Sequence, residues 1–153
     1  MLQAMNTGHK GSLTTIHANS PRDALARLET MILMAAGNLT HETMRRHIAA
    51  AIDLVVQLER FRDGVRRIVS ISEVMGLEEQ IIKLQEIVRF QPRKTDRLDK
   101  TDGEFVSTGV PPSFLEEIQM AGVQMPGHAF AKPAPPPEFK PETLRSEMLR
   151  RRV

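Results

Sequence analysis

The spacing of apolar residues changes about one third of the way along the chain. Up to about residue 52, apolar residues mostly recur every three or four positions, which is typical of amphipathic helices. From residue 53 to residue 90 they alternate with polar residues, which is typical of strands that bury one face. The pattern therefore predicts one α/β domain in which helices come first and an antiparallel meander follows.

A helix end and a short strand are predicted at the start of the chain. Residues 1–7 have the apolar spacing of a last helical turn, and Gly8 fits the residue that ends it. Residues 11–17 combine β-branched and apolar residues on both faces. That pattern suits a buried strand inside a parallel sheet.

Two helices are predicted next. Ser20 fits the N-cap of the first, and Pro21 fits its first position. Gly37 is expected to end this helix, and its buried stripe should comprise Leu25, Leu28, Ile32 and Ala35. Thr40 fits the N-cap of the second helix, which should run to about residue 51. The residues expected inside the second helix are Met44, Ile48 and Ala51.

Residues 53–90 predict three antiparallel strands. The first should be buried mostly on one face, and its alternating apolar residues are Leu54, Val56 and Leu58. Arg62, Asp63 and Gly64 form a hairpin signal before the second strand. Residues 76–79 are expected to form the next turn, and residues 80–90 the third strand. Such a meander favours an α/β core with antiparallel strands at its edge.

The last third of the chain is predicted to contain little regular structure. Residues 104–109 suit a short extended piece, and a short helix should follow with Ser113 and Glu116 as its capping box. Proline becomes frequent after residue 125. We therefore expect a domain at residues 1–125 and a Pro-rich, disordered tail at residues 126–153.

Composition narrows the classes of protein that remain. The chain has 153 residues, no cysteine, and a formal net charge of only +2 from 21 basic and 19 acidic residues. Disulfides and thiolate metal sites are thereby excluded, and no basic face demands nucleic acid. No apolar run reaches the roughly 18 residues of a membrane span. We expect a cytoplasmic protein with one domain and no nucleic-acid partner.

Polar side chains gather at the end of the strand predicted at residues 11–17. Thr14, Thr15, His17 and Asn19 lie there, where open α/β folds place their binding sites. A lone histidine at a strand end is more often a buried core residue bonded to the backbone, and this alternative stays open. No triad of nucleophile, base and acid and no pair of carboxylates is evident, and no metal site is expected, because the histidines lack the helical zinc spacing.

Several other residues have simpler interpretations. Arg45 and Arg46 are typical of solvated charge on a helix flank. Glu73 should lie on a solvated strand face or pair with Arg66 or Arg67. Three methionines suit core or subunit packing rather than a cofactor site: Met31, Met34 and Met44.

Three segments resemble the secretion and pilus-assembly ATPases of the type II/type IV secretion superfamily. Residues 1–31 resemble the segment around their histidine box and read MLQAMNTGHKGSLTTIHANSPRDALARLETM. Residues 51–79 resemble the meander that follows, and residues 108–122 the end of the domain. The branch that this sequence resembles most is the CpaF-type ATPase of the tight-adherence (Flp) pilus. Three separate matches in the same order make the resemblance specific.

The resemblance implies a RecA-like P-loop NTPase core, of which this chain would be the C-terminal part. It also implies ATP and Mg²⁺ as ligands of the intact protein, a homo-hexamer, and a cytoplasmic position beside inner-membrane platform proteins. His17 would be the histidine of the box that senses the state of the nucleotide, supported by Thr14, Thr15 and Asn19. His9 and Arg27 also match recurring positions of the family.

The sequence departs from the family in one essential respect. The string G-x-x-x-x-G-K-[ST], which cradles the phosphates of ATP, does not occur in it. The acidic motifs for magnesium are absent as well. We therefore expect no catalytic residue in this chain, no tight binding of ATP and no hydrolysis without upstream motifs. The alternative function is a non-catalytic interaction module, or a truncated paralogue, that binds or regulates a full-length secretion ATPase.

Overall fold

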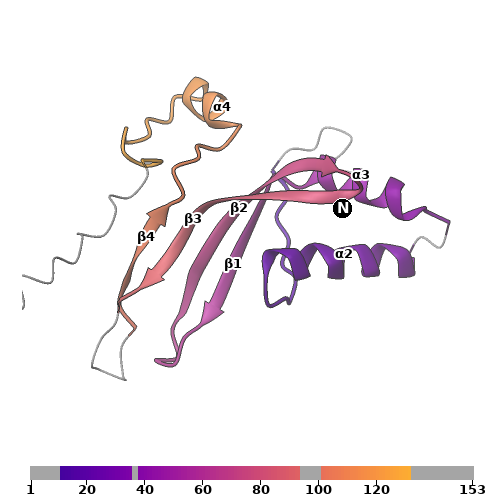
Figure 1. Ribbon diagram of the computed structural model, residues 1–153, viewed down its shortest axis with the longest axis horizontal. Coiled ribbons are helices and arrows are strands. Elements are labelled where there is room, and N and C mark those ends of the chain that lie inside the picture. Colours follow the sequence, from indigo (N-terminus) through magenta and orange to yellow (C-terminus); the bar gives the residue numbers. More distant parts are fainter. Residues whose placement is uncertain (1–10, 36–37, 94–100, 132–153) are drawn as a thin grey trace, which may run out of the picture.

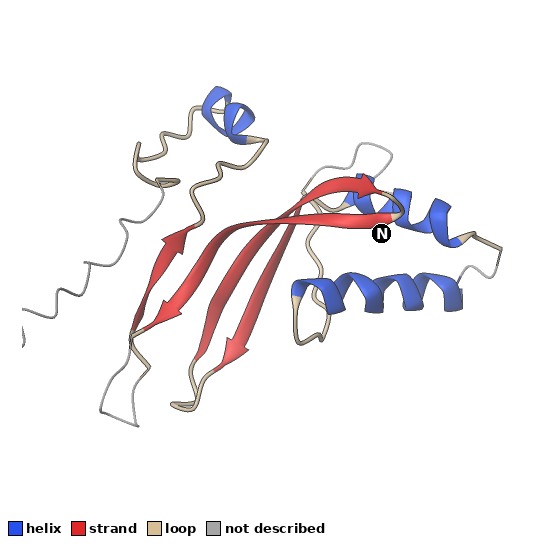
Figure 2. Ribbon diagram, in the orientation of Figure 1, coloured by secondary structure: helices blue, strands red, loops and turns tan. Residues whose placement is uncertain are grey.

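A computed structural model of the protein describes residues 11–35, 38–93 and 101–131. Within these ranges the chain forms helices α2 (Pro21–Ala35), α3 (His41–Ala51) and α4 (Leu115–Met120). One sheet contains the strands β1 (Leu54–Arg60), β2 (Arg66–Glu78), β3 (Ile81–Pro92) and β4 (Gly103–Ser107). The strand order is β1-β2-β3-β4 and every pairing is antiparallel. Figures 1 and 2 show α2 and α3 together at one end of this meander and α4 apart from them.

Both helix starts follow the capping prediction. The Ser20 hydroxyl accepts a hydrogen bond from the Asp23 N–H at 3.1 Å at the start of α2. The Thr40 hydroxyl likewise accepts from the Thr43 N–H at 3.2 Å at the start of α3. Each cap satisfies one N–H that has no partner inside its helix.

The core lies between the two helices and the sheet. Its most buried members are Leu25, Met44 and Ile48, of which Met44 and Ile48 are fully buried. Val55 of β1 and Ile82 and Leu84 of β3 pack against this cluster. The predicted interior of α3 is confirmed, since Ala51 is buried too. In the stripe predicted for α2, Leu25 is buried and Leu28 and Ile32 are half-buried, whereas Ala35 is exposed. Gly37 lies outside the described residues.

Two of the strand predictions were wrong: one strand does not form, and another buries the opposite face. Residues 11–17 form no strand in the structure, and Leu13 is 98% exposed. An extended segment is held as a strand by hydrogen bonds to neighbours, and no described strand pairs with this one. The predicted apolar face of β1 is also exposed, because Val55, on the other face, is the side chain that meets the helices. The predicted helix end at residues 1–7 lies outside the described residues.

The second turn is shorter than the predicted residues 76–79 and ends one residue later. Glu79 and Gln80, both with positive φ, connect β2 to β3. Positive φ at both positions is the conformation that tight two-residue hairpins require. Gly76 lies inside β2 instead, with φ of 108°, where the pairing with β3 shifts register. The glycine therefore marks a bulge and not a turn.

The first turn is organised by Asp63, as the hairpin signal predicted. Its carboxylate accepts two hydrogen bonds from the Arg67 guanidinium, at 3.0 and 2.8 Å, and one from the Val65 N–H at 3.0 Å. The Thr101 N–H donates a further bond at 3.0 Å. These donors, Arg67 first and the Thr101 N–H next, hold the pKa of the Asp63 carboxyl well below its usual range.

Stability should therefore depend on the charge of Asp63. Its folded-state pKa lies below the unfolded value of about 3.9, so its contribution is present above about pH 4 and is lost as the pH falls further. We expect Asp63→Asn to lower the thermal midpoint at pH 7, and the gap between variant and wild type to narrow steadily as the pH falls from about 4 to about 2. Thermal melts across this range measure the gap. Asp53→Asn is a matched control, because the Asp53 side chain is exposed. A gap that stays constant with pH would contradict the assignment.

Glu73 connects the last part of the chain to the sheet. It is 3% exposed, and its carboxylate accepts hydrogen bonds from the Ser113 N–H, at 3.2 and 3.0 Å, and from the Ser113 hydroxyl. Both predictions for this residue were wrong, because Glu73 neither faces solvent nor pairs with Arg66 or Arg67. The capping box was wrong for the same reason: Ser113 is engaged by Glu73, and α4 starts after Phe114 without a side-chain cap.

Removing the Glu73 carboxylate should weaken this attachment. Glu73→Ala removes a buried carboxylate and leaves two donors of Ser113 without their charged acceptor, so we expect a loss of about 1–3 kcal/mol in the free energy of unfolding. It should also give faster amide exchange at residues 108–120. Denaturant melts and hydrogen exchange measure the two effects. Glu59→Ala is the control, because Glu59 is exposed on β1, and it should stay within about 0.5 kcal/mol of wild type. Unchanged exchange in Glu73→Ala would show that Ser113 is held by other contacts.

Candidate functional site

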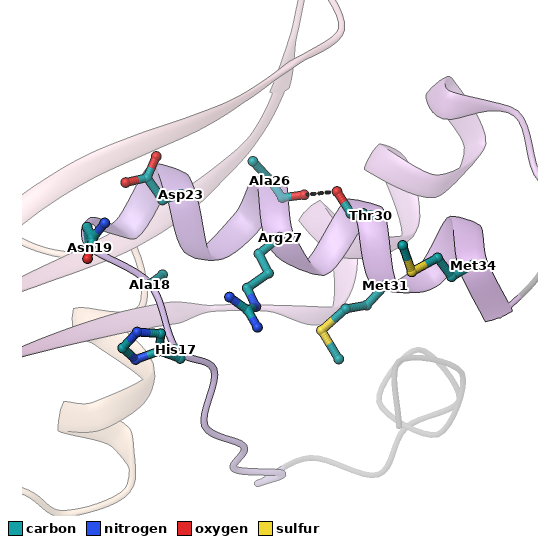
Figure 3. A pocket seen from close by; sticks show the side chains of 9 residues that line it. All are labelled: His17, Ala18, Asn19, Asp23, Ala26, Arg27, Thr30, Met31 and Met34. Carbon is teal, nitrogen blue, oxygen red and sulfur yellow. Dashed lines mark hydrogen bonds between the residues drawn. The ribbon is translucent and has the colours of Figure 1, made fainter.

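An open pocket of about 670 Å³ lies along the outer side of α2 (Figure 3). Its walls come from the loop before the helix and from one face of the helix. The lining residues are His17, Ala18, Asn19, Asp23, Ala26, Arg27, Thr30, Met31 and Met34. It is larger than a second pocket, of about 160 Å³, between α2 and the β2–β3 turn.

The helical period explains why α2 both packs and lines the pocket. Leu25, Leu28 and Ile32 pack in the core with residues of α3 and the sheet. The pocket-lining residues of the helix recur at steps of three and four on the other side, from Asp23 to Met34. Because one stripe of α2 is buried in the core, the pocket-lining residues on the opposite side must face outward.

The loop that carries His17 and Asn19 is attached at two points, Ala18 and Ser20. Ser20, the next residue, caps α2. The Gln57 side-chain amide of β1 donates a hydrogen bond to the Ala18 carbonyl at 3.1 Å. These bonds place the imidazole of His17 and the amide of Asn19 at the entrance to the first turn of α2 (Figure 3).

Three side chains that can donate hydrogen bonds are available to a ligand in the pocket. The side chains of His17, Asn19 and Arg27 are exposed and have no hydrogen bond or ion pair within the described part of the chain. Arg27 extends from α2 toward the side of the pocket where His17 lies (Figure 3). A guanidinium, an imidazole and an amide can all donate to anionic oxygens. The exposure of His17 also overturns the alternative of a buried core histidine.

The structure brings together some of the predicted site residues and not others. His17, Asn19 and Arg27 line one pocket. Thr14 and Thr15 are exposed in the segment before it and do not line it, and His9 lies outside the described residues. The sequence interpretation missed Asp23 and Thr30 as lining residues. Their spacing from Arg27, of four and three residues on one helix, was the available signal.

Arg45 is not the solvated charge that the sequence suggested. Its Nε donates to both carboxylate oxygens of Glu29 at 3.1 Å, and its Nη1 donates to the Gln80 carbonyl at 3.1 Å. This side chain therefore joins α2, α3 and the β2–β3 turn. Arg46 is exposed and pairs with Glu42 on its own helix. Of the three methionines considered, Met44 is in the core, whereas Met31 and Met34 are 53% and 83% exposed along the pocket.

Residues 11–35, 38–93 and 101–131 contain neither a metal-binding cluster nor a helix that spans a membrane. No group of three or more histidine, cysteine, aspartate or glutamate residues there has the arrangement to hold a metal ion. Among the helices of these ranges, none is long and apolar enough to cross a membrane.

Comparison with known proteins defines the class of this protein. Residues 1–101 match the protein family described as "Type II/IV secretion system protein". The match includes the pocket, the core and the first three strands. The chain belongs to this family, in the secretion ATPase superfamily that its sequence resembles.

Individual relatives agree with this assignment. The chain is 41% identical over 78 residues to the conjugal transfer protein TrbB of Rhizobium radiobacter, which is 51% of this chain and 22% of that protein. It is 36% identical over 64 residues to the type IV secretion system protein VirB11 of Bartonella quintana, which is 39% of this chain and 17% of that protein. The similarity thus spans about a fifth of the length of these relatives.

Proposed function

We propose that this chain is part of an ATP-driven secretion motor and that the pocket on α2 is one wall of its nucleotide site. One observation carries the proposal most: His17 and Arg27 line one open pocket, and neither has a partner within the described residues. Membership of the type II/IV secretion family supports it. The proposal assigns these two residues to the terminal phosphate of a nucleotide.

The chemistry of the pocket fits a sensor better than a catalyst. An imidazole and a guanidinium donate hydrogen bonds to phosphate oxygens and can distinguish a bound triphosphate from a diphosphate. The 153 residues contain no G-x-x-x-x-G-K-[ST] string, whose amides and lysine would cradle the phosphates. The phosphate cradle and the magnesium ligands must therefore come from another segment. By itself the chain binds ATP weakly and does not hydrolyse it.

The finer assignment is also part of the proposal. Resemblance to the CpaF-type branch in three segments favours the assembly of a tight-adherence pilus by a homo-hexameric motor. Such a motor would act in the cytoplasm on inner-membrane platform proteins. The named relatives belong to conjugal transfer and type IV secretion.

A chimera tests the role of the pocket. This chain would replace the matching C-terminal segment of the Rhizobium radiobacter TrbB, and ATP hydrolysis would be measured with the chimera and with the chain alone. We expect activity only in the chimera. His17→Ala or Arg27→Ala should lower kcat about 100-fold, the cost typical of losing one donor to a developing charge, with less effect on KM.

Matched variants outside the pocket separate this effect from general damage. His41→Ala and Arg46→Ala remove the same side-chain types from exposed positions on α3, and each should retain nearly full activity. An active chimera in which His17→Ala and Arg27→Ala also retain full activity would sink the proposed role of the pocket.

A further inference from the structure

A basic and apolar surface lies on the β1–β2 hairpin, outside the pocket. The pairing of the strands sets Leu58 opposite Ile68 and Arg60 opposite Arg66. Cross-strand partners share a face of the sheet, and so do residues two positions apart on one strand. These four residues, which we call the hairpin face, therefore present two aliphatic side chains followed by two guanidinium groups. Leu58 and Ile68 are 55% and 36% exposed.

The charge of the hairpin face is not balanced within the described part of the chain. Two like charges directly opposite each other on neighbouring strands are destabilising. Arg66 makes no ion pair there, and neither does Arg62 in the adjoining turn, while Arg60 donates only to the Gly64 carbonyl. The nearest carboxylate in the turn, that of Asp63, is already bound by Arg67. The hairpin face therefore favours an anionic partner that also has apolar side chains.

Helix α4 has the complementary composition. Glu116 and Glu117 lie in its first turn, are exposed, and make no ion pair among the described residues. Met120, four residues after Glu116 and on the same side of the helix, is 85% exposed. The attachment of Ser113 to Glu73 fixes the start of this helix on the sheet. Helix α4 therefore presents an acidic group and then an apolar one, and its start is fixed on the sheet.

The spacing of the two surfaces also agrees. Four residues of helix advance about 6 Å, and two residues of strand advance about 6.6 Å. Glu116 and Met120 are therefore separated along α4 by nearly the distance that separates Arg66 from Ile68 along β2. Within one chain the two surfaces cannot meet, because α4 and the β1–β2 turn lie at opposite ends of the strands (Figure 1).

We propose that α4 of one copy of this chain binds the hairpin face of a second copy. Glu116 and Glu117 pair with Arg60, Arg62 and Arg66, and Met120 packs against Leu58 and Ile68. Each copy has one surface of each kind, so the contact is head-to-tail and repeats from copy to copy. This contact rests on the proposed homo-oligomer and names its surfaces, but none of its residues lines the pocket, so the chimera experiment above and the association experiment below can fail independently.

Charge reversal provides a test with its own internal rescue. One variant carries Glu116→Lys and Glu117→Lys, and the other carries Arg62→Glu and Arg66→Glu. Sedimentation equilibrium of the full chain over a range of concentrations measures self-association. We expect each variant alone to associate about ten-fold or more weakly than wild type. An equimolar mixture of the two should regain association, because every contact between unlike variants again joins opposite charges.

Controls separate the contact from changes in folding or in total charge. Arg22→Glu with Arg46→Glu changes the net charge as much as the hairpin variant does, but at exposed sites on α2 and α3, and should associate like wild type. Met120→Ser leaves every charge in place and should weaken association. The single changes Glu116→Lys and Arg66→Glu repeat the rescue with less risk to the fold. A wild-type chain that stays monomeric would overturn the proposal, and so would mixtures that fail to regain association. Binding of the hairpin to anionic lipid vesicles with no self-association would assign this surface to a membrane instead.

Discussion

The packing of α3 against the meander is the interaction on which the rest of the structure depends. Met44 and Ile48 are fully buried between α2 and the strands, and each contributes roughly 1.5–3 kcal/mol through its removal from water. Leu25 of α2 packs on the same cluster. The outer side of α2, and with it the pocket, is therefore positioned relative to the sheet mainly through α3.

The local features of this fold were predictable from the sequence because neighbouring residues determine them. Ser20 and Thr40 cap helices that begin one residue later, and the carboxylate of Asp63 closes its own turn. In each case a side chain binds a backbone group two or three residues away. Such bonds form with little loop-closure entropy and depend little on tertiary context.

The predictions failed where a distant partner competes with a local one. Ser113 had a local role as the cap of α4, but it binds Glu73, forty residues earlier, because a buried carboxylate requires donors. The apolar face of β1 is a second case. Alternation shows that Leu54 and Val56 share a face, but only the position of α3 decides that Val55, on the other face, is covered. In the candidate site, family resemblance indicated His17, Asn19 and Arg27, whereas the remaining lining residues required knowledge of which side of α2 is buried.

Arg45 gives the pocket a direct connection to the sheet. Glu29, which it holds through both carboxylate oxygens, lies on α2 between the pocket-lining residues Arg27 and Thr30. The same guanidinium binds the Gln80 carbonyl in the turn between β2 and β3. A half-buried ion pair is stronger than an exposed one, since solvent and salt screen it less. A shift of α2 along its axis must therefore either move the β2–β3 turn with it or break this pair. Through Arg45, the position of the pocket-lining helix is linked to the two longest strands of the sheet.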